Sequence, residues 1–452
     1  MFESILIANR GEIAVRIARA CRELGVRVIA VYSTEDRDSM VVRLADDAVA
    51  IGPAQAKLSY LNMAAVMEAA RMTKAEAIHP GYGFLSENPD FAEVCEAEGV
   101  AFIGPPASVL SRLGDKTSAR RIMQAAGLPL LPGCLDPVED VEAAQELADS
   151  IGYPVIVKAA AGGGGRGLQV VPDRGGFVHS FQSSRVNAQA FFGDGRLYVE
   201  RYLRSARHVE VQVLCDAYGN AVSLGARDCS VQRRYQKLVE EAPPPGLPTE
   251  LVDGMCAAAV RGARSVGYVG PGTFEFLVDP DGNYYFMEVN CRIQVEHPVT
   301  EMVTGVDLIA EQIRVAAGEP LRLTQQDVQV RGASIECRIN AEDPDQNFVP
   351  RSGVLTEFIP PGGPFVRLDT HAYPGYRVPH AFDSLLAKLI VWAPDRDQAI
   401  TRMLRALAEF RISGDHLATT IGFLGEVLDD HRFRAAAHDT SLLPALLSER
   451  ER

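Results

Sequence analysis

A predicted β-hairpin at residues 273–290 carries two carboxylates and an amide whose spacing suits the binding of a cation. Its first strand alternates apolar and polar side chains, and Asp-Pro-Asp-Gly at 279–282 has the composition of a turn. Because side chains alternate along each strand, Glu275, Glu288 and Asn290 fall on one face. The sequence therefore predicts that two carboxylates and an amide oxygen converge.

Symmetric pairing about the turn gives the expected register of this hairpin. Glu275 then faces Phe286, and Thr273 faces Glu288. Two carboxylates this close among apolar and aromatic residues would repel each other unless a cation lay between them. Oxygen ligands favour magnesium or manganese, and magnesium commonly shares its shell with phosphates. An edge hairpin with a solvated polar face is the alternative interpretation.

More polar and charged residues follow the hairpin. If the chain stays extended beyond Asn290, the same alternation brings Arg292, Gln294 and Glu296 to the side of the carboxylates. A metal, an arginine and a spare carboxylate on one ribbon indicate phosphoryl chemistry.

A glycine-rich run at 159–167 lies between two predicted strands, 153–158 and 168–171. Consecutive glycines free the backbone to wrap phosphate oxygens with N–H groups, and Lys158 and Arg166 add positive charge. No Gly-Lys-Ser/Thr sequence opens a helix after the run, so it is not a Walker A loop. A flexible linker is the alternative, but the flanking strands favour a phosphate-binding loop.

The elements that position these groups form three predicted domains. Residues 1–114 begin with a β-turn-α-β pattern typical of a doubly wound sheet, without the G-x-G-x-x-G dinucleotide motif. Residues 115–330 contain the glycine run and the hairpin, and we expect about 132–203 to form a lid. Residues 331–446 mix alternating strands with an amphipathic helix near 395–410, which predicts an α+β domain.

The amino-acid composition argues against several functional classes of protein. The 452 residues include 45 Lys and Arg against 59 Asp and Glu, a net charge of −14, which argues against a nucleic-acid-binding surface. Eight cysteines without a CxxC pair or a His/Cys cluster fit reduced thiols and no zinc site. No apolar run approaches the roughly 18 residues of a membrane span, and no signal-peptide pattern begins the chain. We expect a soluble cytoplasmic protein.

Three polar features have an ordinary structural interpretation when each is taken alone. His79 ends a predicted strand and is expected to pack there. The basic segment 227–237 is expected to be a solvated loop, and Arg338 an arginine on the exposed face of its strand.

Taken together and in order, seven motifs resemble those of the biotin carboxylases, a branch of the ATP-grasp ligases. They are IANRGEIAVRI, HPGYGFLSEN, the glycine run, RDCSVQRRYQK, TFEFL, MEVNCRIQVEHPVTE and ECRINAEDP, and they extend over essentially the whole chain. The resemblance implies a Rossmann-like N-terminal domain, a central ATP-grasp domain with a mobile lid and a C-terminal α+β biotin carboxylase domain. In that family ATP phosphorylates bicarbonate, and the carboxyphosphate or its CO2 carboxylates biotin on a separate carrier protein.

The resemblance also assigns binding roles to individual residues. ATP would be bound by Lys116, Lys158, Gly164, Gly165, Glu200, Arg201, Tyr202, Leu203, His208 and Tyr235. Magnesium or manganese, with two ions expected, would be held by Glu275, Glu288 and Asn290. Bicarbonate would be held by Lys237, Arg292, Gln294 and Val295.

The catalytic residues implied by the family are Lys237, Arg292, Glu296 and Arg338. Glu296 would deprotonate bicarbonate, and Arg338 would stabilise the enolate that forms when biotin loses its ureido proton. Two residues depart from the family pattern: Tyr235 replaces a histidine, and Ala161 replaces a fifth glycine. A neutral phenol should weaken nucleotide binding rather than chemistry, and alanine should stiffen the loop modestly.

The expected partners follow from the resemblance. They are a biotin carboxyl carrier protein, carboxyltransferase subunits and a second copy of the chain, contacted through Arg19, Glu23 and Arg367, with no nucleic acid and no membrane. The sequence has no Ala-Met-Lys-Met-like biotin attachment site, as expected for a free-standing subunit. We expect the carboxylase subunit of acetyl-CoA carboxylase, in malonyl-CoA and fatty acid synthesis.

Two alternatives stay open. The carboxylase subunit of a pyruvate or propionyl-CoA carboxylase is one, because the absent transferase chooses the acceptor. A catalytically silent, nucleotide-binding regulatory subunit is the other, and the presence of the family's metal-binding and catalytic side chains argues against it.

Overall fold

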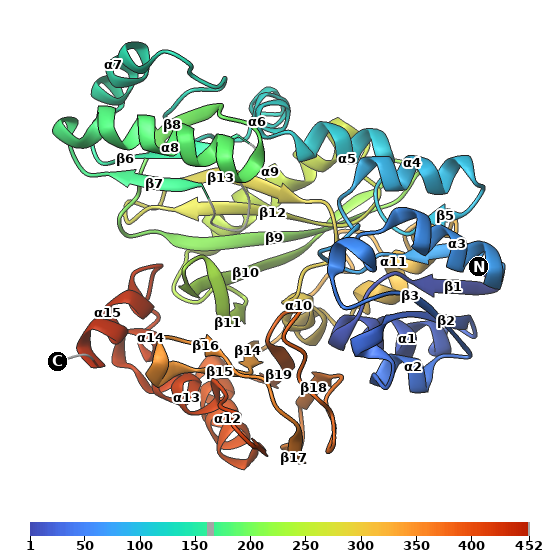
Figure 1. Ribbon diagram of the computed structural model, residues 1–452. Helices are drawn as coiled ribbons and strands as arrows, with labels where there is room; N and C mark the ends of the chain where they lie inside the picture. The colour runs from blue at the N-terminus through green and yellow to red at the C-terminus, as the bar shows by residue number, and fades with distance from the viewer. Residues whose placement is uncertain (161–166, 451–452) are drawn as a thin grey trace.

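The computed structural model describes residues 1–160 and 167–450. Three regions surround a long central sheet: an N-terminal sheet, a small sheet at the far end and a C-terminal region below (Figure 1). The expected mixture of a Rossmann-like, an ATP-grasp and an α+β part is confirmed. No helix described here is long and apolar enough to cross a membrane.

The N-terminal region is a five-stranded parallel sheet in the order β3-β2-β1-β4-β5. Its strands are β1 (Ser4–Ile7), β2 (Arg27–Ser33), β3 (Asp47–Gly52), β4 (Ala77–His79) and β5 (Ala101–Phe102). The helices of this part are α1 (Gly11–Glu23), α2 (Met40–Leu44), α3 (Met63–Thr73), α4 (Pro89–Ala97) and α5 (Ala107–Gly114). β1 is buried along its whole length, as a strand covered on both faces must be.

The central sheet has eight strands in the order β13-β12-β9-β10-β11-β14-β19-β18, all antiparallel to their neighbours. The strands are β9 (Arg207–Cys215), β10 (Ala221–Arg233), β11 (Gln236–Ala242), β12 (Gly270–Val278), β13 (Tyr284–Asn290), β14 (Ala333–Asn340), β18 (Val366–Thr370) and β19 (Leu385–Ala393). β14 alternates as predicted. It pairs with β11, so the central sheet extends across the predicted domain boundary between residues 330 and 331.

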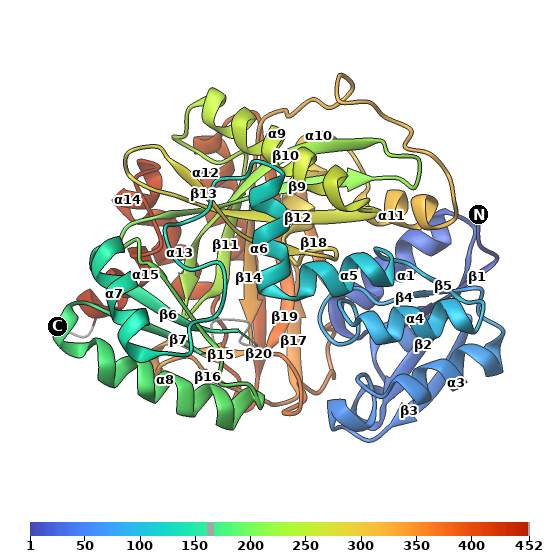
Figure 2. The same ribbon diagram turned by 90° about the horizontal axis from the view of Figure 1, so that it is seen from above.

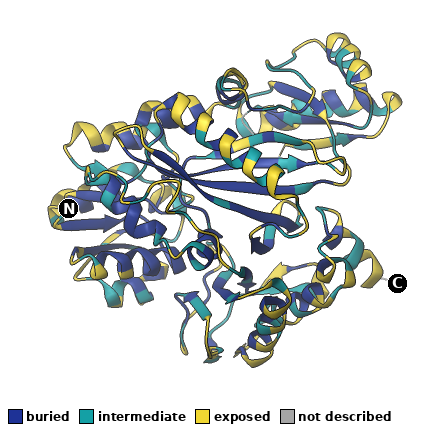
Figure 3. Ribbon diagram, turned by 180° about the vertical axis from the view of Figure 1, so that it is seen from behind, coloured by how far each residue is buried: buried dark blue, intermediate teal, exposed yellow. Residues whose placement is uncertain are grey.

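The two faces of this sheet differ in chemistry. α6 (Lys116–Ala125) and α9 (Thr249–Val266) cover one face and pack on apolar side chains such as Val209, Val211 and Phe274. Figure 3 shows these strands buried and the outer sides of the helices exposed. Because side chains alternate, His208, Glu210 and Glu275 of the same strands project from the other face.

The small sheet has the order β7-β6-β8 and its own apolar core. It comprises β6 (Val155–Ala159), β7 (Leu168–Val171), β8 (Leu197–Arg201), α7 (Val141–Ile151) and α8 (Phe177–Phe192). α8 lies along the outer edge of the molecule beside β6 and β7 (Figure 2). The predicted lid, 132–203, contains this whole unit; its motion stays a prediction.

The other elements connect and cover the main sheet. They are α10 (His297–Thr304), α11 (Leu308–Ala316), α12 (Arg396–Glu409), α13 (Ile421–Asp429), α14 (His431–Arg434), α15 (Leu442–Arg450) and the short strands β15 (Glu342–Asp343), β16 (Val349–Pro350), β17 (Leu355–Ile359) and β20 (Arg411–Gly414). The predicted amphipathic helix is α12, which Asp395 caps by accepting a hydrogen bond from the Gln398 N–H.

Gly262 allows α9 to lie close against the sheet. A methyl group there would lie 2.8 Å from both Met123 Sδ and Phe274 Cε1. We expect Gly262→Ala to lower the free energy of unfolding by about 1–3 kcal/mol in a denaturant titration. Gly254→Ala on the same helix is the control, because its methyl would meet Tyr284 only at 3.7 Å. Equal stability of the two variants would refute the close packing.

Candidate functional site

The register of the β12–β13 hairpin differs from the predicted one. Glu275 pairs with Glu288 and Thr273 with Asn290, so the predicted Glu275–Phe286 and Thr273–Glu288 pairs are wrong. The pairing shifts between Glu275 and Phe276, where an irregularity in the ladder interrupts the symmetric count from the turn. Glu275, Glu288 and Asn290 still lie on one face, and the two carboxylates lie directly opposite each other.

The expectation of an extended chain beyond Asn290 is also wrong. β13 ends there, and a turn leads to α10, whose first turn contains Pro298. The turn still brings the predicted residues together. Gln294 Nε2 donates to Glu275 Oε1 at 3.1 Å, and Arg292 Nη2 donates to Asn290 Oδ1 at 3.1 Å.

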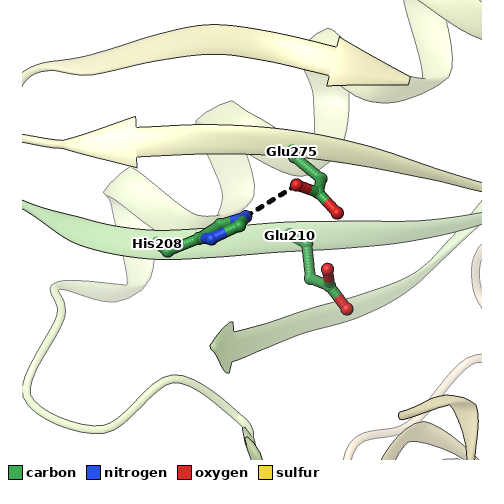
Figure 4. A group of neighbouring side chains, drawn as sticks. All are labelled: His208, Glu210 and Glu275. Carbon is green, nitrogen blue, oxygen red and sulfur yellow. Dashed lines mark hydrogen bonds and ion pairs between the residues drawn. The ribbon is translucent and has the colours of Figure 1, made fainter. Parts of the chain in front are cut away.

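Lys237 lies at the centre of the polar face. Its Nζ is 2.6 Å from Glu210 Oε2, 2.6 Å from Glu296 Oε1 and 3.1 Å from Glu275 Oε1. His208 Nε2 lies 2.8 Å from Glu275 Oε2, and Figure 4 shows that His208, Glu210 and Glu275 converge from two neighbouring strands. Although burial opposes it, Glu275 raises the pKa of His208.

Glu210 and Arg227 are members of the site that the sequence predictions missed. Arg227 is fully buried, and it donates to Glu210, Gln212, Thr273 and Thr300. The expected solvated loop at 227–237 is wrong, because most of it belongs to β10 and β11. The alternation from His208 to Val213 could have placed Glu210 beside His208. Nothing local reveals that Arg227 faces them.

Glu296 is held between two cations. Lys237 binds its Oε1, and Arg338 Nη2 lies 2.9 Å from its Oε2. Burial alone would raise the pKa of Glu296, but Lys237 and Arg338 hold it well below its usual range. The carboxylate is therefore ionised at neutral pH.

Arg338 is partly buried rather than on an exposed face, and Glu240 explains its presence. Arg338 Nε donates to Glu240 Oε1 at 2.6 Å across the β11–β14 pair. Burial raises the pKa of Glu240 to about 7, although Arg338 opposes this shift. Glu240 is a third residue of the site that the sequence predictions missed.

One cleft of about 1410 Å³ contains the predicted site. Among the residues that line it are Lys116, Lys158, Glu200, Arg201, Tyr202, Leu203, His208, Tyr235, Lys237, Glu275, Glu288, Asn290, Arg292, Gln294, Val295, Glu296 and Arg338. The predicted Gly164 and Gly165, with Ala161 and Arg166, lie outside the described residues. All other predicted site residues therefore meet in one place.

The end of the cleft beside β8 also carries charge. Lys158 Nζ lies 2.6 Å from Glu200 Oε2, and Arg120 binds the other oxygen of this buried carboxylate. Burial lowers the pKa of Lys116, an effect that Lys158 reinforces. Tyr235 occupies the β10–β11 turn with a φ of 66° and is half exposed to the cleft.

The carboxylate pair fits a hard divalent cation. Burial and the charge of Glu275 together raise the pKa of Glu288, a strain that a cation between them would relieve. Asn290 fits less directly, because its amide nitrogen donates to Glu275 at 2.8 Å while its oxygen faces Arg292. The donor set is thus two carboxylates with an amide close by.

Two other groups of predicted residues lie elsewhere. His79 is buried at the end of β4, and burial lowers its pKa to about 3, in agreement with a packing role. Arg19 and Glu23 are exposed on α1. Arg367 forms ion pairs within the chain, at 2.6 Å to Glu301 and 2.7 Å to Asp369.

Comparisons with protein families identify the whole chain. Residues 1–110 match "Biotin carboxylase, N-terminal domain", residues 115–324 "Carbamoyl-phosphate synthase L chain, ATP binding domain" and residues 336–445 "Biotin carboxylase C-terminal domain". The biotin carboxylase of Nostoc sp. is 54% identical over 98% of both chains. A pyruvate carboxylase subunit of Methanothermobacter thermautotrophicus is 50% identical over 96% of this chain and 88% of the relative.

Solved structures agree with these matches. The Campylobacter jejuni biotin carboxylase, described as a complex with β,γ-ATP, superposes with a TM-score of 0.96 at 46% identity, over 98% of this chain and 99% of the other. The biotin carboxylase domain of the Hydrogenobacter thermophilus 2-oxoglutarate carboxylase, a dimer described with MgADP, ADP and bicarbonate, gives 0.95 at 46% identity over 98% of each chain. With motifs, fold and cleft in agreement, the chain belongs to the biotin carboxylase family of ATP-dependent ligases.

Proposed function

We propose that this protein carboxylates biotin on a carrier protein with ATP and bicarbonate, as the first half-reaction of acetyl-CoA carboxylase. The observation that carries this proposal is the arrangement of Lys237, Glu296 and Arg338 within one cleft, which is also lined by those predicted nucleotide residues that the structure describes. The relatives named biotin carboxylase over their full length support it.

Bicarbonate would bind beside Lys237, Arg292, Gln294 and Val295. These residues offer two cations, an amide and a backbone N–H, which suit a small planar anion. Glu296 is ionised, so it can accept the bicarbonate proton while a bicarbonate oxygen attacks the γ-phosphorus of ATP. The bond from that phosphorus to the β,γ-bridging oxygen breaks, and ADP leaves.

Biotin would lie beside Arg338. Cleavage of the carboxyphosphate bond between carbon and the phosphate oxygen would give CO2 and phosphate, and this phosphate would accept the ureido N–H proton. The fixed guanidinium stabilises the negative charge left on the ureido oxygen while the nitrogen attacks CO2. Glu240 orients the guanidinium from behind, since Arg338 Nε donates to it at 2.6 Å. This positioning keeps the cation fixed where charge develops.

ATP would occupy the end of the cleft near β8, with Lys116, Lys158 and His208 toward its phosphates and 200–203 at its base. The residues at 132–203 would close over it as a lid, a proposal supported by the separate core of that unit.

Glu275 and Glu288, with Asn290 nearby, would hold magnesium or manganese, expected as two ions, which neutralise phosphate charge when bound. Tyr235 would contact nucleotide as a neutral group.

We further propose three domains, at 1–114, 115–330 and 331–446, in a cytoplasmic homodimer that serves a biotin carboxyl carrier protein and carboxyltransferase subunits. The solved relative described as a dimer supports the oligomeric state. A pyruvate carboxylase subunit is the second candidate, because a relative of that name is 50% identical.

Purified protein tests the proposal directly. ADP release should depend on both bicarbonate and free biotin, and carboxybiotin should form in step with ADP. Arg338→Gln should lower carboxylation by about 100-fold or more, the scale of removing a group that stabilises developing charge. Arg204→Gln, which changes an exposed arginine, is the matched control. ATP turnover that is independent of bicarbonate and biotin would contradict the proposal.

Glu288 tests the metal site. Its raised pKa means that protons compete with the metal, so stabilisation by Mn²⁺ should grow as the pH rises above the ordinary range of a carboxyl group. Glu288→Gln should remove this thermal shift and lower ATP turnover by at least about tenfold. Asp281→Asn at the tip of the same hairpin should keep both. A full Mn²⁺ shift in Glu288→Gln would show that the ion binds elsewhere.

A further inference from the structure

Two fully buried side chains hold the backbone on both sides of Val295. His297 Nδ1 lies 2.7 Å from the Gln294 carbonyl oxygen, and Lys388 Nζ lies 2.8 Å from the Val295 carbonyl oxygen. A carbonyl oxygen only accepts, so both side chains donate, and the proton of the His297 ring resides on Nδ1. Both residues come from outside the predicted site.

These two hydrogen bonds fix the direction of the Val295 N–H. The Gln294–Val295 peptide is trans, so its N–H points away from the carbonyl that His297 holds. Val295 and Glu296 both line the cleft. With the carbonyls on either side of Val295 bound to the protein interior, the peptide cannot rotate without breaking a buried hydrogen bond.

Lys388 is an unusual residue for its position. It lies in the middle of β19, has no exposed surface and pairs across the ladder with Arg338. A buried lysine is unfavourable unless it is paired, and its partner is Glu12 in the first turn of α1, at 3.1 Å. Glu12 in turn accepts a hydrogen bond from the Tyr82 hydroxyl. An apolar residue would fill this position more favourably, unless the ammonium group is needed for its contacts.

We propose that Lys388 and His297 are positioning residues that preorganise the Val295 N–H for bicarbonate. The inference rests on the proposed function, because it takes bicarbonate to bind at Val295. A backbone donor that is fixed before the anion arrives needs no reorganisation when it binds.

Lys388→Met tests the proposal by removing the donor while keeping most of the side-chain length. The KM for bicarbonate should rise about tenfold or more, as for loss of a hydrogen bond from a charged donor, while the KM for ATP stays within about twofold. Because the single change leaves Glu12 buried without its cation, Glu12→Gln/Lys388→Met is the second variant. It removes both charges and should show the same selective rise in KM.

Glu12→Gln is the matched control, because it removes the ion pair and keeps the lysine donor on Val295. Its KM for bicarbonate should stay close to that of the unaltered protein. A folded double variant with an unaltered KM for bicarbonate would overturn the inference. Equal rises in both KM values would overturn it as well, because they indicate a general structural role. If the unaltered protein shows no bicarbonate-dependent turnover, the proposed function fails first and the inference with it.

Discussion

Three buried carboxylates of the site share one ammonium group, that of Lys237. Glu210, Glu275 and Glu296 lie within 3.1 Å of it, on β9, β12 and the turn before α10. Carboxylates this close in a low-dielectric environment repel strongly without a cation between them. Breaking a buried ion pair typically costs about 3–5 kcal/mol, and here one cation serves three partners. The geometry of the site therefore depends on this group.

The rest of the cluster extends the same alternation of charge. Arg227 forms an ion pair with Glu210, and Arg338 forms ion pairs with both Glu296 and Glu240. The result is a set of ionisable groups whose pKa values move apart: that of Glu296 falls far below the neutral range, and that of Glu240 rises to about 7. Paired groups with separated pKa values are suited to moving protons at neutral pH. Burial and the neighbouring charged side chains separate these pKa values before any substrate binds.

Local sequence was enough to predict part of this site. Alternation placed Glu275, Glu288 and Asn290 on one face, and ordered motifs indicated the family and the three-part fold. The ladder irregularity after Glu275 was not predictable from the turn, because the extra residue lies in β13, where Phe286 also bridges to Leu130, a residue far away in the sequence. Arg227 and Glu240 were missed for a related reason, since their partners lie on strands that meet only in the finished sheet.

Replacement of Lys237 by Met tests the central claim most directly, with bicarbonate-dependent ADP release and thermal unfolding followed between about pH 5 and 8. Without the shared ammonium, the folded-state pKa values of Glu275 and Glu296 should rise above their unfolded values, and that of Glu210, which burial already raises, should rise further. Stability should then fall as the pH rises, and ADP release should fall by about 100-fold or more. Turnover equal to that of the unaltered protein, or a loss of stability that is the same at every pH, would contradict the account.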